Sequence, residues 1–213
     1  MGNIPSVEEI LLSERNLDAE SPWLERLGVA PSEASRAVAF DRSAVAVVGN
    51  GAFGEPRGQE IDAFPTVVRF NGFKTKGFEE MAGSKTTIHV LNSQNLALAR
   101  PNPAGPMYLL IDTCTPARMF EFYFANLHRV AGLQIVRPSL YRQLGCLLHG
   151  RYKTQGYFFI ELARLHFDSV AIAGFSGQNH YFDARWKMYA AHPLEAEHQK
   201  YAAWESPTFR QLS

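Results

Sequence analysis

Short apolar runs alternate along the chain with longer stretches whose apolar residues recur at helical spacing. Residues 45–48 and 66–70 are two such runs, rich in β-branched side chains, and each predicts a strand buried on both faces. Further strands are expected at residues 86–91, 107–111, 133–136 and 169–173. The first run ends at Gly49-Asn50-Gly51, where the backbone must turn sharply or approach another segment closely.

Helical periodicity indicates what lies between those strands. It predicts helices over residues 59–64, 115–131, 154–167 and 194–204. Two shorter helices are expected in the N-terminal segment 1–43, one starting near Ser6 and one after Pro31. Alternating strands and helices predict an α/β fold: a single Rossmann-like domain, with a mainly parallel sheet flanked by helices and its core at residues 44–213.

Composition narrows the choice of partner and compartment. The chain has 213 residues, and its 21 Lys and Arg balance its 21 Asp and Glu, which argues against nucleic acid or an anionic membrane as the main partner. No apolar run approaches the roughly 20 residues of a membrane span, and no secretory signal pattern is present. The two cysteines, Cys114 and Cys146, lack metal-ligand spacing, so we expect a reducing, cytoplasmic location.

Polar residues stand directly behind two of the expected strands. Asn50 follows the first strand closely, and Asn71 ends the second. The carboxyl ends of parallel strands meet at the ligand-binding edge of an open sheet. An amide side chain both donates and accepts hydrogen bonds, which suits contacts to ribose and a nucleobase. Taken alone, each Asn fits turn formation or strand-end capping better than ligand binding.

The glycine turn admits a second interpretation. Residues 49–54 match the dinucleotide fingerprint G-x-G-x-x-G, which requires a helix from the second glycine and an acidic residue about 20 positions on. Pro56 and Gly58 break helices where that helix should run, and the later position is Asn71. The glycines concerned are Gly49, Gly51 and Gly54. An NAD(P)-dependent oxidoreductase therefore remains an alternative, beside a glycine turn with no binding role.

Two long motifs resemble those of the eukaryotic-type sialyltransferases, glycosyltransferase family 29. Val-Val-Gly-Asn-Gly at 47–51, Gly-x-x-Ile-Asp at 58–62 and Arg-x-Asn at 69–71 are similar to the large sialyl motif. Tyr-Lys-Thr-Gln-Gly at 152–156 and Val-Ala-Ile-Ala-Gly-Phe at 170–175 resemble the small sialyl motif. The resemblance rests on the order of these segments as much as on their residues.

Two shorter motifs follow in the order that the family shows. His-Tyr-Phe-Asp at 180–183 fits the third motif, and His192 with Glu197 fits the very small motif H-x-x-x-x-E. The chain departs from the animal members at Val45 and Phe167, where those members carry two disulfide-linked cysteines. The absence of both cysteines and of a membrane anchor leads us to expect a compact, soluble, bacterial relative.

The resemblance implies a reaction. It is the inverting transfer of sialic acid, or of the related ulosonic acid Kdo, from a CMP conjugate to a sugar hydroxyl of a glycan or glycolipid, on a variant of the GT-A glycosyltransferase fold. CMP leaves with a single phosphate, and the chain has no D-x-D carboxylate pair for Mg²⁺ or Mn²⁺, so we expect neither a metal nor a cofactor. A non-catalytic CMP-binding module is a further alternative.

The same resemblance assigns roles to single residues. His192 is the expected general base, since an imidazole that titrates near neutrality can take the proton of the acceptor hydroxyl. His180 is expected to contact the leaving phosphate and to protonate it. Donor binding is expected from Asn50, Gly51, Asn71, Tyr152, Thr154, Gln155, Gly156, Gly174, Phe175 and Tyr181. Residues 154–156 open a helix whose free N–H groups can face an anion, while Glu197 and Arg69 are expected to orient the site.

Overall fold

The computed structural model of the chain describes residues 41–99, 105–114, 133–135, 141, 143–177, 179–183 and 192–212. The two helices expected near Ser6 and after Pro31, and the helix expected over 115–131, lie outside the described residues. Within the described part, no helix is both long and apolar enough to cross a membrane.

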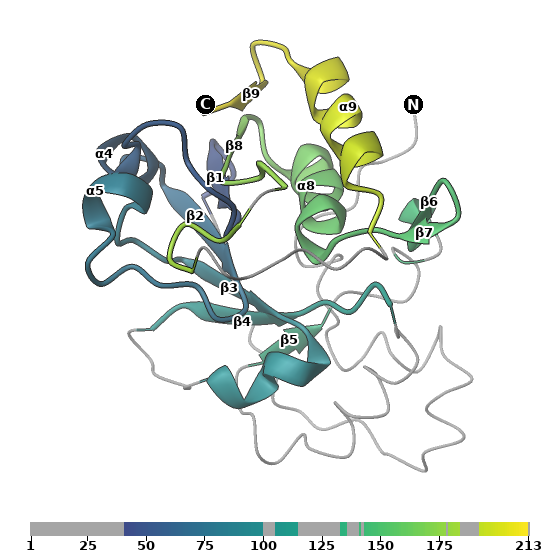
Figure 1. Ribbon diagram of the computed structural model, residues 1–213, viewed down its shortest axis with the longest axis horizontal. Helices are drawn as coiled ribbons and strands as arrows, with labels where there is room; N and C mark the ends of the chain where they lie inside the picture. Colours follow the sequence, from purple (N-terminus) through teal and green to yellow (C-terminus); the bar gives the residue numbers. More distant parts are fainter. Residues whose placement is uncertain are drawn as a thin grey trace.

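A seven-stranded sheet forms the centre of the described fold (Figure 1), in the order β5-β4-β3-β2-β1-β8-β9. Its strands are β1 (Val45–Val48), β2 (Thr66–Phe70), β3 (Ile88–Leu91), β4 (Met107–Leu110), β5 (Leu133–Ile135), β8 (Val170–Ala173) and β9 (Phe209–Gln211). Each neighbouring pair of these strands runs parallel, and Val45 of β1 pairs with Thr66 of β2 on one side and Val170 of β8 on the other. The expected parallel α/β sheet is confirmed.

The strands β1 and β8 are apolar throughout, as expected where helices cover both faces of a sheet. On β1, Val45 and Val47 belong to the core cluster that contains the apolar side chains of α8 (Gln155–His166). Ala46 and Val48 alternate with them and pack in a second cluster with Ile61 of α4 (Gly58–Asp62). The side-chain period of two thus sends neighbouring residues to opposite layers.

The remaining helices lie on the same two sides. Figure 1 shows α5 (Glu79–Ala82) beside α4, and α9 (Leu194–Trp204) beside α8. The predicted helices at 59–64, 154–167 and 194–204 correspond to α4, α8 and α9, with shifts of at most a few residues at the ends. Five elements were not predicted: α5, the 3₁₀ helix η1 (Ser93–Leu98), the two-stranded hairpin of β6 (Leu147–Leu148) and β7 (Arg151–Tyr152), and β9.

The direction of winding reverses between β1 and β8. From β1 the chain adds β2, β3, β4 and β5 outward on one side, and then returns to place β8 and β9 on the other side. In open α/β sheets, ligands bind at such a reversal, outside the carboxyl ends of the strands. The candidate site must therefore be sought where Gly49 to Gly51 and Gly174 follow these two strands.

The backbones that leave β1 and β8 lie in direct contact. The N–H of Gly49 donates to the carbonyl oxygen of Ala173 at 2.8 Å, and the N–H of Gly51 donates to that of Gly174 at 2.7 Å. A Cβ atom built on Gly49 would lie 2.4 Å from the carbonyl oxygen of Gly174, closer than real Cβ contacts come. Glycine is thus required here by the approach of two backbones, before any ligand is considered.

Candidate functional site

One polar residue follows each of four adjacent strands at the carboxyl edge of the sheet. These residues are Asn50 after β1, Asn71 after β2, Asn92 after β3 and Asp112 after β4. The sequence singled out the first two, and the structure adds the last two. The same signal, a polar residue one or two positions behind an apolar run, was present at Asn92 and Asp112 and could have found them.

Asn50 holds the glycine turn against β2 and leaves one acceptor unused. Its Nδ2 donates to the carbonyl oxygen of Phe70 at 3.1 Å. Its backbone carbonyl accepts from the N–H of Tyr181 at 3.0 Å. Its Oδ1 is buried and has no hydrogen-bond partner among the described residues. A buried amide oxygen without a donor is costly, so this atom can accept a hydrogen bond from a ligand at the switch point.

Asn71 joins the large and small motifs, which lie far apart in sequence. Its Nδ2 donates to Oε1 of Gln155 at 2.9 Å, and its Oδ1 accepts from the N–H of Asn92 at 3.1 Å. Gln155 in turn donates from Nε2 to the carbonyl oxygen of Ile111 at 3.0 Å. Asn71 has a φ of 49°, a left-handed conformation that Asn tolerates better than most residues. The two amides therefore connect β2, β3, β4 and α8.

The N-terminus of α8 points its free donors into this edge. Thr154 is the N-cap, because its Oγ1 accepts from the N–H of Tyr157 at 3.0 Å. The backbone N–H groups of Gln155 and Gly156 have no acceptor among the described residues. Unpaired N–H groups and the helix dipole together favour an anion at this position.

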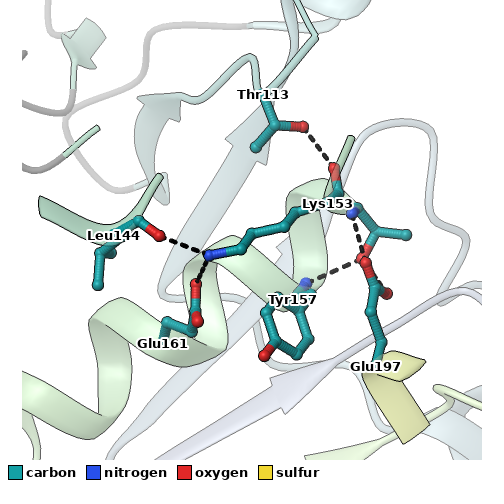
Figure 2. Close-up of polar contacts among 7 residues, drawn as sticks. Thr113, Leu144, Lys153, Tyr157, Glu161 and Glu197 are labelled. Carbon is teal, nitrogen blue, oxygen red and sulfur yellow. Dashed lines mark hydrogen bonds and ion pairs between the residues drawn. The ribbon is translucent and has the colours of Figure 1, made fainter. Parts of the chain in front are cut away.

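Glu197 of α9 completes the cap of α8. The carboxylate is 2% exposed and accepts from the N–H of Thr154 at 2.7 Å and from its Oγ1 at 2.8 Å (Figure 2). Burial raises the pKa of the Glu197 carboxyl, while the two hydrogen bonds from Thr154 and the nearby His192 oppose that rise. These contacts join Glu197 to α8 rather than to its own helix, and its expected orienting role in the site stays a prediction.

Replacing Glu197 with Ala should lower the free energy of unfolding by about 1–3 kcal/mol, because the Thr154 donors lose a charged acceptor. Glu197→Gln should show a pH effect. A carboxyl whose pKa is raised in the fold contributes stability below its unfolded value of about 4.5, and that contribution is lost as the pH rises through the folded pKa. Urea titrations should show the wild-type stability falling relative to Glu197→Gln above pH 4.5. Glu195→Gln, an exposed change on the same helical turn, is the control.

His192 lies beside the small motif with its ring held at one nitrogen. Nδ1 is 2.9 Å from the carbonyl oxygen of Tyr152. A carbonyl can only accept, so Nδ1 carries the hydrogen and the neutral ring has its lone pair on Nε2. This is the tautomer that a general base needs. Tyr152 itself is 42% exposed, and the structure gives its backbone a role that the sequence did not suggest.

His180 and Tyr181 are placed over the glycine turn by a short loop. His180 forms antiparallel bridges with Gly51 and with Asp183. Burial lowers the pKa of His180, against the opposing effect of Asp183, so the ring is neutral at neutral pH in the ligand-free chain. The ring of Tyr181 packs edge-on against Phe53, and its hydroxyl donates to the carbonyl of Lys74.

Two of the other predicted site residues have clear packing roles. The ring of Phe175 lies edge-on to those of Phe70 and Tyr201, with centroids 6.2 and 5.8 Å away, so Phe175 packs in the core next to the site. Arg69 is fully buried, and its Nε and Nη2 donate to the carbonyl oxygens of Lys85 and Ala82 at 2.9 and 2.7 Å. Arg69 thus holds the turn after α5, while its expected orienting role in the site and the donor contacts by Phe175, Gly174 and Tyr181 stay predictions.

The described residues contain no group of three or more His, Cys, Asp or Glu side chains arranged to hold a metal ion. Cys114 and Cys146 are both free thiols. Burial raises the pKa of each thiol above its usual value, so neither is a ready nucleophile at neutral pH.

The chain is an open α/β protein, and its candidate site lies at the switch point of a parallel sheet. Residues 24–106 match the model of "Glycosyltransferase family 29 (sialyltransferase)". Beta-galactoside alpha-2,6-sialyltransferase 2 of Takifugu rubripes is 42% identical over 80 residues, which are 37% of this chain and 14% of that protein. The Bos taurus protein of the same name is 38% identical over 105 residues, 46% of this chain and 20% of that protein. Both matches thus span a fifth of the relative or less.

Solved structures share the fold over nearly the whole chain. A mammalian sialyltransferase in complex with Gal-beta-1-3GalNAc-ortho-nitrophenol superposes with a TM-score of 0.68 at 20% identity, covering 99% of this chain and 92% of that one. The expected variant of the GT-A fold is confirmed. Over part of its length, residues 24–106 in the family match and less than half of the chain in each of these relatives, the chain is thus similar to glycosyltransferase family 29. The relatives are animal proteins, so the bacterial origin expected from the sequence finds no support.

The oxidoreductase alternative is not favoured. The helix after the glycine turn, α4, begins at Gly58 rather than at Gly51, so no helix N-terminus faces a pyrophosphate there. A Cβ atom on Gly54 would meet nothing within 4 Å, whereas the third glycine of the dinucleotide fingerprint allows close packing of helix and strand. Gly49 and Gly51 serve the contact with Gly174 instead.

Proposed function

We propose that this chain is an inverting glycosyltransferase that transfers sialic acid from CMP-sialic acid to a sugar hydroxyl. The observation that carries the proposal is the convergence of the four motifs at one place. The Asn71–Gln155 hydrogen bond joins two of them, the Glu197–Thr154 contacts join a third, and the Gly51–His180 bridge joins the last. Residues far apart in the sequence, 84 positions in the case of Asn71 and Gln155, thus come together near the N-terminus of α8.

The donor is bound at the switch point between β1 and β8. Oδ1 of Asn50 accepts from the nucleoside, since it is buried and has no partner within the described chain. The free N–H groups of Gln155 and Gly156 receive the phosphate at the N-terminus of α8. His180 donates a neutral N–H to the same phosphate, whose negative charge would raise the lowered pKa of the ring.

The transfer step needs one base and a stabilised leaving group. The acceptor oxygen forms a bond to the anomeric carbon while its proton passes to Nε2 of His192, the nitrogen left free by the contact with Tyr152. The bond from the anomeric carbon to the phosphate oxygen breaks, and its electron pair leaves with CMP. Donors fixed in advance around that phosphate lower the barrier. Attack opposite to the leaving group inverts the anomeric centre.

The relatives favour sialic acid over Kdo as the transferred sugar, because those matched are named beta-galactoside alpha-2,6-sialyltransferases. A galactose-ended glycan is the corresponding acceptor. No cofactor enters this mechanism, and donors from the backbone and from His180 take the place of a divalent cation at the leaving phosphate. Kdo and a purely CMP-binding role remain as outcomes of the test.

Ligand-dependent stabilisation tests the donor site directly. CMP at about 100 times its Kd should stabilise the chain by about 2.7 kcal/mol, and NAD(P)H should not stabilise it. Asn50→Ala should weaken CMP binding roughly 3- to 10-fold, the worth of one hydrogen bond. Gln59→Ala removes an exposed amide from α4 on the other face of the sheet and should leave CMP affinity unchanged. Stabilisation by NAD(P)H alone would revive the oxidoreductase alternative.

Product analysis separates the remaining possibilities. Purified protein should transfer sugar from CMP-sialic acid to a β-galactoside, with the linkage read by NMR, and the rate should persist in EDTA. If the protein transfers sugar only from CMP-Kdo, the proposed donor is wrong. If it binds CMP but transfers no sugar, it is a non-catalytic CMP-binding module. Loss in EDTA with recovery in Mg²⁺ or Mn²⁺ would contradict the metal-independent mechanism.

A further inference from the structure

A buried ion pair lies beside the site without a part in the proposed chemistry. Lys153 is 3% exposed, and its Nζ donates at 2.7 Å to Oε2 of Glu161 and at 2.7 Å to the carbonyl oxygen of Leu144 (Figure 2). Taking two charges out of water is costly, and a buried pair often adds little to stability compared with apolar residues of similar size. Stability alone therefore does not explain why the Lys153–Glu161 ion pair lies at this position.

The ion pair anchors a hairpin that has little else to hold it. The strands β6 and β7 have two residues each, and such a hairpin is marginal alone. Leu147 and Tyr152 on it are 52% and 42% exposed, and Leu148 is only partly buried against the core, so the apolar burial of the hairpin is limited. Lys153 binds the start of the hairpin twice, from Nζ to Leu144 and from its backbone N–H to the carbonyl oxygen of Cys146 at 2.8 Å. Glu161 fastens this assembly to α8.

Lys153 also lies between Tyr152 and Thr154, and these two neighbours contact His192 and Glu197 of the proposed catalytic site. Tyr152 before it supplies the carbonyl oxygen 2.9 Å from Nδ1 of His192. Thr154 after it caps α8 and binds Glu197. The carbonyl oxygen of Lys153 accepts from Oγ1 of Thr113 at 2.6 Å, which fixes the segment to the end of β4. A shift of Lys153 would therefore move the carbonyl that orients His192.

We propose that Lys153 and Glu161 are positioning residues for His192: their ion pair fixes the Tyr152 carbonyl, and that carbonyl selects the Nδ1–H tautomer that leaves Nε2 free. The proposal rests on the proposed role of His192 as base. It gives a reason for a charged residue at a buried position of the small motif.

The test compares variants that remove the pair in different ways. Lys153→Met alone removes the cation that pairs with the partly buried carboxylate of Glu161 and is expected to destabilise the chain. The double variant Lys153→Met, Glu161→Leu replaces both charges by apolar groups and should recover most of the melting temperature. Its kcat should nevertheless fall roughly 10- to 100-fold, as expected for a displaced catalytic group, with the KM for the CMP-sugar unchanged. Recovery of kcat together with stability would overturn the proposal.

The tautomer of His192 gives a readout that does not depend on activity. Long-range ¹H–¹⁵N correlation spectra, assigned with His192→Gln, should show one Nδ1–H tautomer in the wild type and a mixture in the double variant. Lys200→Met is the control, since it removes an exposed cation from α9 instead of the ion pair. It should change neither kcat nor the tautomer.

These outcomes separate the two proposals. In one outcome, the wild type lacks transferase activity while the double variant still shows the tautomer shift. That result would defeat the proposed function but keep the link between the Lys153–Glu161 pair and the tautomer of His192. An active double variant with a single Nδ1–H tautomer would defeat the link and leave the proposed function standing.

Discussion

Transfer of the sugar should fall by roughly two to four orders of magnitude when His192 is replaced by Ala, the usual worth of a positioned base. The affinity for CMP should stay within about twofold, because the proposed partner of the ring is the acceptor hydroxyl. Hydrolysis of the donor by water should fall less, since breakage of the bond to the phosphate is already advanced when water attacks. Initial rates with saturating CMP-sialic acid, together with calorimetric titration of CMP, measure these quantities.

Two further variants separate a base from a structural histidine. His192→Gln can still donate from its amide to the carbonyl of Tyr152, but it cannot take a proton at the acceptor. It should therefore be as slow as His192→Ala; near wild-type transfer by the Gln variant would mean that only the contact with Tyr152 matters. His149→Asn, in the turn between β6 and β7, is the control, because His149 is exposed with a φ of 48° that Asn tolerates.

The strands could be predicted because parallel strands covered on both faces leave a plain signal. The runs at 45–48 and 66–70 matched β1 and β2 to the residue, since every side chain in them is buried. The hairpin of β6 and β7 left no such signal. Three of its four residues are exposed and only Leu148 packs partly against the core, so no buried apolar run marks its strands in the sequence.

Part of the site could be predicted from local patterns and part could not. Asn50 and Asn71 stand behind apolar runs, and the His192–Glu197 spacing fitted a motif. The interaction of Glu197 with Thr154 joins residues 43 positions apart, and no local rule predicts which helix a buried carboxylate will cap. Lys153 looks from the sequence like an ordinary surface lysine.

Replacing Gly49 with Ala should damage both the fold and the donor site. The new Cβ would lie 2.4 Å from the carbonyl oxygen of Gly174, so the backbones leaving β1 and β8 must separate. Overpacking of this kind costs typically 1–3 kcal/mol, and here it acts on backbone atoms that cannot rotate away. The same movement displaces Asn50, so CMP affinity should fall roughly tenfold or more. Urea denaturation and CMP titration measure the two effects.

Gly54→Ala is the matched control for that prediction. A Cβ atom at Gly54 would meet nothing within 4 Å, so stability and CMP affinity should stay at their wild-type values. A dinucleotide site would behave differently, because its third glycine is needed for packing of the helix on the strand. If Gly54→Ala were as damaging as Gly49→Ala, the turn would act as a dinucleotide fingerprint after all. If Gly49→Ala were harmless, the contact between the ends of β1 and β8 would not be what requires glycine there.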